Sequence, residues 1–182
     1  QPFTAVRGLP RHTGTAAPGT SAALRVDWAS HSVHSVAGKE VVVLDGETRR
    51  YTLALAAPLG AGWGGRLELD YLAHSGGVLD PLIADWHRFF RLPEGERPNQ
   101  PHHRVRYTVT DADGRTRVLR SGDAAGPGDA AASVTRRLLG GPGRGLGLGL
   151  RLEAPTGAAG RMLGSGGWEA AAWLGGEWGQ AT

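Results

Sequence analysis

The sequence predicts an all-β protein with antiparallel strands, either an up-and-down β-barrel of outer-membrane type or a soluble β-sandwich or barrel, for three reasons. Apolar and polar residues alternate with a period of two in several segments, which is typical of strands with one apolar and one polar face. Glycine (30 residues) and proline (11 residues) are spread through the 182 residues and disfavour long helices. No segment approaches the ~18 consecutive apolar residues that a transmembrane helix requires. We therefore interpret residues 1–182 as a single β-barrel domain or a fragment of one, complete or incomplete in its strands.

The clearest alternation lies in Arg66–Leu72, His103–Thr110 and Gly145–Leu152. Further strands are predicted at Ala22–Ser30, Lys39–Leu44, Glu47–Ala57, Arg115–Ser121, Ala131–Leu139 and Trp168–Trp178. Several have the length of about nine to eleven residues that a tilted membrane-spanning strand needs. In such a barrel the apolar faces would contact lipid and the polar faces would line the lumen, with Arg25, Asp27, Arg66, Glu68, Asp70, Arg104 and Arg106 as the candidate lumen-facing residues.

Turn sequences separate these strands. Asp45-Gly46 and Asp113-Gly114 are dipeptides that favour two-residue hairpins, because both central residues of such turns need positive φ. Pro58–Gly65 and Gly140–Arg144 are rich in glycine and proline and predict looser turns.

One segment has helical rather than strand periodicity. Asp80-Pro81 offers an N-cap followed by proline at the first helical position. Apolar residues then recur at helical spacing, and Leu92-Pro93-Glu94-Gly95 ends the pattern. We expect one short amphipathic helix near 80–90 in a long loop (75–102) that folds back on the barrel mouth or lies at the membrane interface. Because long loops on rigid β scaffolds tend to carry recognition, its candidate functional residues are His74, Asp80, Asp85, Trp86 and His87.

Chemistry is poorly supported in this loop. The His and Asp side chains could hold a metal ion or act in acid–base catalysis, but their spacing matches no metal motif, and capping explains Asp80. His74 and Ser75 are neighbours on a strand and should point to opposite faces, which argues against a Ser/His hydrolase pair. Cysteine is absent, so thiolate metal sites and disulfides are excluded. We predict no catalytic residue, cofactor or metal, and expect the protein not to be an enzyme.

The charge balance argues against a nucleic-acid partner. The net charge is +3, but the 20 basic residues are mixed with 17 acidic ones along the chain. Basic residues form no run longer than pairs such as Arg49-Arg50. The sequence starts at Gln1 rather than at methionine, and we expect that a signal peptide has been removed upstream.

A family resemblance covers most of the chain. It rests on Gln1-Pro2-Phe3, Gly8-Leu9-Pro10, Leu44-Asp45-Gly46-Glu47 with Tyr51, and above all on His74-Ser75-Gly76-Gly77-Val78-Leu79-Asp80 leading into Ile83, Trp86-His87, Phe89-Phe90 and Leu92-Pro93. This pattern resembles the bacterial domain-of-unknown-function family 3187. The resemblance implies a Gram-negative outer-membrane β-barrel with no assigned activity, and it supplies no catalytic residues.

The expected function is therefore that of an outer-membrane β-barrel, channel-like or structural, whose partner is membrane lipid. One alternative is a soluble β-sandwich or barrel, periplasmic or secreted, that binds a ligand or partner. The other is a barrel enzyme that acts on lipid. Period-two alternation alone fits all three, because a soluble sheet also has one apolar and one polar face.

Overall fold

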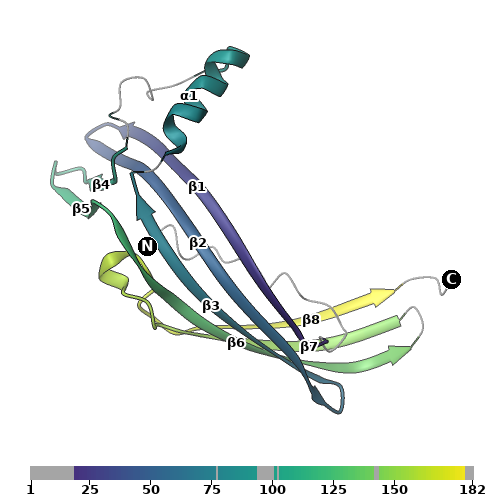
Figure 1. Ribbon diagram of the computed structural model, residues 1–182. Coiled ribbons are helices and arrows are strands. Elements are labelled where there is room, and N and C mark those ends of the chain that lie inside the picture. The colour runs from purple at the N-terminus through teal and green to yellow at the C-terminus, as the bar shows by residue number, and fades with distance from the viewer. Residues whose placement is uncertain (1–18, 77, 94–100, 102, 142–143, 179–182) are drawn as a thin grey trace. The chain divides into compact units, whose positions relative to one another are not determined.

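The computed structural model describes residues 19–76, 78–93, 101, 103–141 and 144–178. Eight strands and one α-helix lie in this part of the chain (Figure 1): β1 (Ser21–Ala37), β2 (Glu40–Gly60), β3 (Trp63–Ser75), α1 (Leu79–Phe90), β4 (Arg106–Thr110), β5 (Thr116–Ser121), β6 (Ala124–Gly141), β7 (Arg144–Ala154) and β8 (Glu169–Trp178). A single 3-10 turn, Ala159–Arg161, follows β7. The predicted all-β class with one short helix is confirmed. None of the described helices has the length and apolarity needed to cross a membrane.

The strands form one antiparallel sheet with the order β5-β4-β2-β3-β6-β7-β8, and β1 also pairs with β2. Among the described strands, β5 and β8 end this order and do not pair with each other, so the sheet is open. The closed barrel that the sequence predicted is therefore not formed by these strands. Alternation specifies the faces of each strand but does not specify how many strands close a sheet, which explains the difference.

The described residues fall into two compact units. The first unit contains the described parts of 1–25, 51–71 and 126–182, and the second contains 26–50 and the described parts of 72–125. Because β2 runs through position 50, it contributes residues to each of them. Each unit is described separately.

The first unit has a sheet whose two faces differ sharply. Residues of one face, here the inner face, are mostly buried and, apart from Trp173, are polar or small: Thr52, Ala54, Ala56, Arg66, Glu68, Asp70, Ala131, Ser133, Arg151, Glu153 and Trp173. The large apolar residues of the other face, here the outer face, are leucines and valines with exposed fractions from 38% to 67%: Leu53, Leu55, Leu67, Leu69, Val134, Leu148, Leu150, Leu152 and Leu174. Ala132, Arg136 and Ala172 share this face. The register confirms the assignment, since Leu150 lies opposite Val134 of β6 and Ala172 of β8. The predicted alternation is therefore present, with the charged face buried and the apolar face exposed.

Packing on the inner face depends on glycine. Gly149 of β7 lies opposite Trp173 of β8, and a Cβ at Gly149 would overlap the indole ring. The indole thus lies over the glycine backbone, and Trp173 is 8% exposed. Leu163 is the most buried apolar residue of the segment after β7 and lies against Gly126. The apolar core of this unit is therefore small and is shared with polar groups.

The first unit also corrects a predicted turn. Between Pro58 and Gly65 the chain makes a tight two-residue turn rather than a loose one, because Ala61 and Gly62 have φ of 48° and 78° and join β2 directly to β3. Both central residues of a type I′ hairpin need such positive φ. The predicted turn at 140–144 contains residues 142–143, which lie outside the described part.

In the second unit, a hairpin at Asp113-Gly114 is confirmed, but it is not the tight two-residue turn: β4 ends at Thr110, β5 starts at Thr116, and of the dipeptide only Gly114 has positive φ. The Asp45-Gly46 hairpin is wrong. Gly114 (φ 79°) joins β4 to β5, and the Asp111 carboxylate accepts the backbone N–H groups of Asp113 and Arg115. Asp45 and Gly46 instead lie inside β2. A Cβ at Gly46 would lie 3.4 Å from the carbonyl oxygens of Ser75 and Arg104, so the glycine permits a close backbone approach rather than a turn.

Helix α1 lies in an insertion between β3 and β4, and both of these strands pair with β2. At the end of β3, Ser75 accepts a hydrogen bond from Arg49 of β2 (3.3 Å), and β4 then pairs with β2 from Asp45 to Val41. The two ends of the insertion meet, because a Cβ at Gly76 would overlap the backbone of His103. Helix α1, the coiled teal ribbon that follows β3 in Figure 1, therefore belongs to a loop that leaves the sheet and returns to it at the same place.

Candidate functional site

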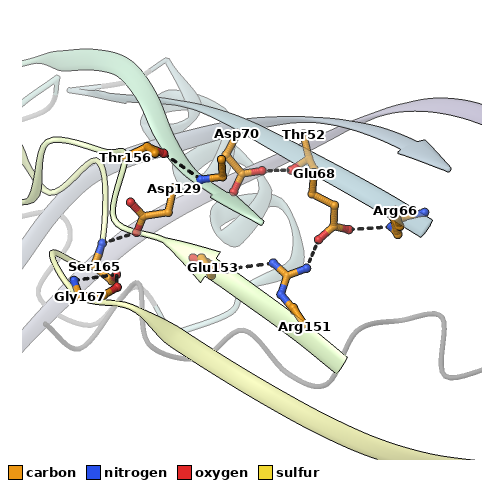
Figure 2. A network of polar contacts seen from close by, with 11 residues as sticks. Thr52, Arg66, Glu68, Asp70, Asp129, Arg151, Glu153, Thr156, Ser165 and Gly167 are labelled. Carbon is orange, nitrogen blue, oxygen red and sulfur yellow. Dashed lines mark hydrogen bonds and ion pairs between the residues drawn. The ribbon is translucent and has the colours of Figure 1, made fainter. Parts of the chain in front are cut away.

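The inner face of the first unit carries a chain of ionic contacts (Figure 2). Arg151 of β7 donates to Glu68 of β3 and, through Nη2, to Glu153 at 2.9 Å. Arg66 donates through Nε to the other oxygen of Glu68 at 3.0 Å. Arg151 lies opposite Ser133 of β6, so its side chain reaches over the intervening strand to join β3 and β7. Two cations and two carboxylates thus form a charge-balanced group within a mostly buried face.

Exposure shows how strongly this group is withdrawn from solvent. The side chains of Arg151 and Glu153 are 12% and 5% exposed, and that of Glu68 is 19% exposed. Buried charges persist only when they are paired and hydrogen-bonded, and this network meets that requirement. Nearby, the Thr52 hydroxyl donates to Asp70 at 2.6 Å, which satisfies a further buried carboxylate.

A second carboxylate of the first unit fixes the segment after β7. Asp129 is 3% exposed and accepts the backbone N–H groups of Gly157 (2.8 Å) and Ser165 (2.5 Å). The Thr156 hydroxyl donates to the Gly128 carbonyl and accepts the N–H of Ala130. The loop is thus bound to the start of β6 by polar contacts, some of which Figure 2 shows.

The second unit has a separate polar cluster at the base of the inserted loop. The Thr48 hydroxyl lies between two imidazoles, 3.1 Å from His31 Nε2 and 2.8 Å from His74 Nδ1. The Tyr107 ring meets both imidazoles edge to face, with centroids 6.0 and 6.5 Å away. Burial lowers the pKa of His31, and the nearby His74 lowers it further. Both effects favour the neutral form of His31, and the contacts of the cluster connect β1, β2, β3 and β4.

The hydrogen bond of His74 also shows whether His74 and Ser75 form the Ser/His pair of a hydrolase. His74 contacts Thr48, whereas the neighbouring Ser75 accepts a hydrogen bond from Arg49. The two side chains have different partners, as the alternation of a strand requires. They do not form a nucleophile–base pair.

Glu47 stabilises the start of α1, a role that the sequence had suggested for Asp80. The Glu47 side chain accepts the Trp28 indole N–H (2.7 Å) and the backbone N–H of Leu79, the first helical residue (2.6 Å). Glu47 is 1% exposed, so its carboxylate is satisfied inside the unit. The predicted N-cap at Asp80 is wrong: the helix begins at Leu79, its N-cap is Val78, and Val78 has no side-chain acceptor. A carboxylate from β2 supplies the missing acceptor at this positive helix end.

The remaining loop candidates lie apart from one another. Asp80 accepts the backbone N–H of His103 (3.3 Å), and Asp85 pairs with Arg88 (3.0 Å) in solvent. His87 Nδ1 lies 3.0 Å from the Pro93 carbonyl oxygen. In the described part of the chain, no group of three or more His, Asp or Glu residues is arranged to hold a metal ion. The structure therefore does not bring the predicted loop residues into one chemical site.

The candidate lumen residues are divided between the two units. In the first, Arg66, Glu68 and Asp70 lie together on the inner face in the contacts described above. Arg25 of the same unit is exposed, and Asp27 of the second unit is partly buried. Three of the predicted residues thus belong to one polar face.

Strand β4 of the second unit corrects the predicted assignment of its faces. Arg104 pairs with Asp45 at 3.0 Å, but Arg106 is exposed. Tyr107 is 2% exposed, although alternation placed it on the lipid side, and its neighbour Thr108 is buried as well, at 4%. The reason is tertiary: the Tyr107 ring packs against His31 and His74.

The sequence did not single out three residues that make important contacts in these sites, namely Arg151, Asp129 and Glu47. The alternation of Gly145–Leu152 had already separated Arg151 from the leucines, so it carried a signal for the inner face. Asp129 and Glu47 gave no such signal, because their partners are backbone N–H groups far along the chain.

The family model described as "Protein of unknown function (DUF3187)" matches residues 1–182, the whole chain. The chain belongs to this family. DUF3187 membership confirms the resemblance drawn from the sequence, although Gln1–Phe3 and Gly8–Pro10, which helped to carry it, lie outside the described residues. No curated protein and no solved structure matches the chain. The description of DUF3187 specifies no activity, so function must be inferred from the two faces of the sheet.

Proposed function

We propose that this DUF3187 protein is a β-protein of the bacterial outer membrane, channel-like or structural and without catalytic activity. The observation that carries the proposal is the reversed polarity of the first unit. Its buried face holds Arg151, Glu68 and Glu153, while its exposed face consists mainly of leucine, valine and alanine, with Arg136 opposite Leu148. Soluble antiparallel sheets bury the apolar face and expose the polar one.

The extent of the apolar face supports lipid as the partner. The large apolar residues of the outer face come from β2, β3, β6, β7 and β8, and all are at least 38% exposed. Monomeric soluble proteins rarely expose continuous apolar patches of more than a few hundred Å². In a bilayer the same side chains would contact acyl chains, and strands with apolar residues outward and polar residues inward are the pattern of outer-membrane proteins.

Residues near the ends of β3 fit the same interpretation. Trp63 begins the strand and is covered on one side by Arg136, whose guanidinium lies 5.0 Å from the indole centroid. Leu67 and Leu69 follow on the outer face, and Tyr71 stands 47% exposed beyond them. Aromatic residues concentrate at the two boundaries of a membrane, so we assign the membrane-spanning segments to strand residues of the first unit.

The inner face fits the water-filled or plugged interior of a barrel better than it fits a catalytic site. Its charges are already paired with one another, and the loop bound by Asp129 belongs to the same unit. Backbone groups cannot remain unpaired in lipid, so an open sheet in a membrane requires that its edge strands find partners. We therefore propose that the edge strands of the open sheet pair with further strands in the membrane.

The test is fractionation of the expressed protein. Our proposal predicts a membrane fraction that needs detergent for extraction and runs at a different electrophoretic mobility before and after boiling. A monodisperse protein that is soluble without detergent would contradict it and would favour the soluble β-protein.

A further inference from the structure

We propose that α1 binds a lipid membrane at the level of the headgroups, as an interfacial anchor carried by the second unit. The helix has no buried residue. Its large apolar side chains are exposed instead, with exposed fractions of 63% for Leu82, 58% for Trp86 and 80% for Phe89. Phe90 joins them, with its ring centroid 4.4 Å from that of Trp86 and 4.8 Å from that of Phe89. An aromatic and aliphatic surface of this kind requires a partner.

The second unit holds this surface out rather than covering it. At the base of the helix, Glu47 accepts the N–H of Leu79, and Asp80 accepts that of His103. The N–H of Gly76, where the insertion begins, donates to Asp123 at 3.3 Å. These contacts fix the first turn to the unit and leave the later turns, which carry the aromatic residues, facing solvent.

The charges around the aromatic residues fit a phosphate-bearing surface. Arg88 lies in the last turn, where it pairs with Asp85 at 3.0 Å, and Arg91 is the C-cap residue. Cations next to Trp and Phe side chains on one short helix are the pattern of helices that lie in the membrane interface, where rings enter the acyl boundary and cations meet phosphates. This chemistry favours lipid over an apolar protein groove.

The position of α1 along the chain agrees with a place at the membrane interface, an argument that rests on the proposed function. Strand β3 has 13 residues, which extend over about 43 Å at about 3.3 Å per residue. With a tilt of about 35–45°, they span roughly 30–35 Å along the membrane normal, compared with an apolar band of about 25 Å. A strand that enters the apolar band near Trp63 has therefore left it by Ser75, and α1 starts four residues later, at Leu79.

The experiment uses the absence of cysteine from the chain. Phe89→Cys, Arg88→Cys and Leu69→Cys are made singly in the full chain and labelled with an environment-sensitive fluorophore. The proteins are reconstituted in vesicles of phosphatidylcholine and phosphatidylglycerol. Arg88 is the matched control, because its side chain is 71% exposed on the same helix but lies about 100° around the helix axis from Phe89. Quenching is measured with aqueous iodide and with spin-labelled lipid.

The anchor predicts that lipid-borne quencher reduces the signal at residue 89 severalfold more than the signal at residue 88, with the opposite order for iodide. Iodide quenching at residue 89 together with lipid quenching at residue 69 would overturn the anchor and leave the proposed function standing. Iodide quenching at residue 69 would overturn the proposed function itself. Protection of residue 89 from both quenchers, dependent on protein concentration, would mean that a second copy covers α1, and it would overturn the anchor.

Discussion

Replacing Arg151 with methionine removes the cation that lies between Glu68 and Glu153. The carboxylates would then remain on the inner face without it, and Glu153 has a side chain only 5% exposed. Arg66 would still neutralise part of the charge on Glu68, at 3.0 Å. Removal of one partner from a buried ion pair costs about 3–5 kcal/mol, and we expect Arg151→Met to lower the free energy of unfolding by about that amount.

The assay is equilibrium unfolding by urea of the detergent-folded protein, with the slope checked for constancy between variants. Arg88→Met is the matched control, because it also removes the arginine of an ion pair. Arg88 pairs with Asp85 at 3.0 Å, the distance between Arg66 and Glu68 in the buried network, but the side chains of Arg88 and Asp85 are both about 70% exposed. That control should cost about 0–1 kcal/mol. Adding Glu153→Gln to Arg151→Met should recover part of the loss, because it removes one buried charge. Equal costs for Arg151→Met and Arg88→Met would refute the buried network.

Two further perturbations test the packing and the histidine cluster. Gly149→Ala should destabilise the protein by about 1–3 kcal/mol in the same assay, because the new Cβ would overlap the Trp173 ring. The control Gly167→Ala should cost far less, because a Cβ at Gly167 would lie in open space. Equal costs for the two variants would contradict the packing of Trp173 on Gly149. The lowered pKa of His31 means that the unfolded chain binds its proton more readily, so stability should fall as pH drops below about 6.5 and be retained above it. His31→Asn should flatten that dependence in unfolding measured from pH 5 to 8, and an unchanged slope would mean that His31 is not its origin.

The faces of the strands could be predicted from the sequence because alternation follows directly from strand geometry. Leu67, Leu69 and Glu68 lie on the sides that the pattern assigned to them. The helix near 80–90 was also predictable, since its apolar spacing is local. These features depend on residues close together in the chain.

The rest depends on contacts between distant residues. Gly46 resembled a turn residue, but it is required where the backbones of Ser75 and Arg104 approach β2. Glu47 caps a helix that starts 32 residues later, and no local pattern records that contact. The ion pair from Arg151 to Glu68 depends on β6 lying between their strands, an order that alternation does not specify.

The central claim is that the outer face of the first unit contacts lipid, and Leu150 tests it most directly. Leu150 is 52% exposed at the middle of β7. In protein folded into vesicles, Leu150→Arg should lower the free energy of unfolding by about 2–4 kcal/mol, because a cation would enter the apolar band. Leu150→Ala serves as the control and should cost much less. A cost for Leu150→Arg within about 0.5 kcal/mol, as for an exposed residue of a soluble protein, would contradict the account.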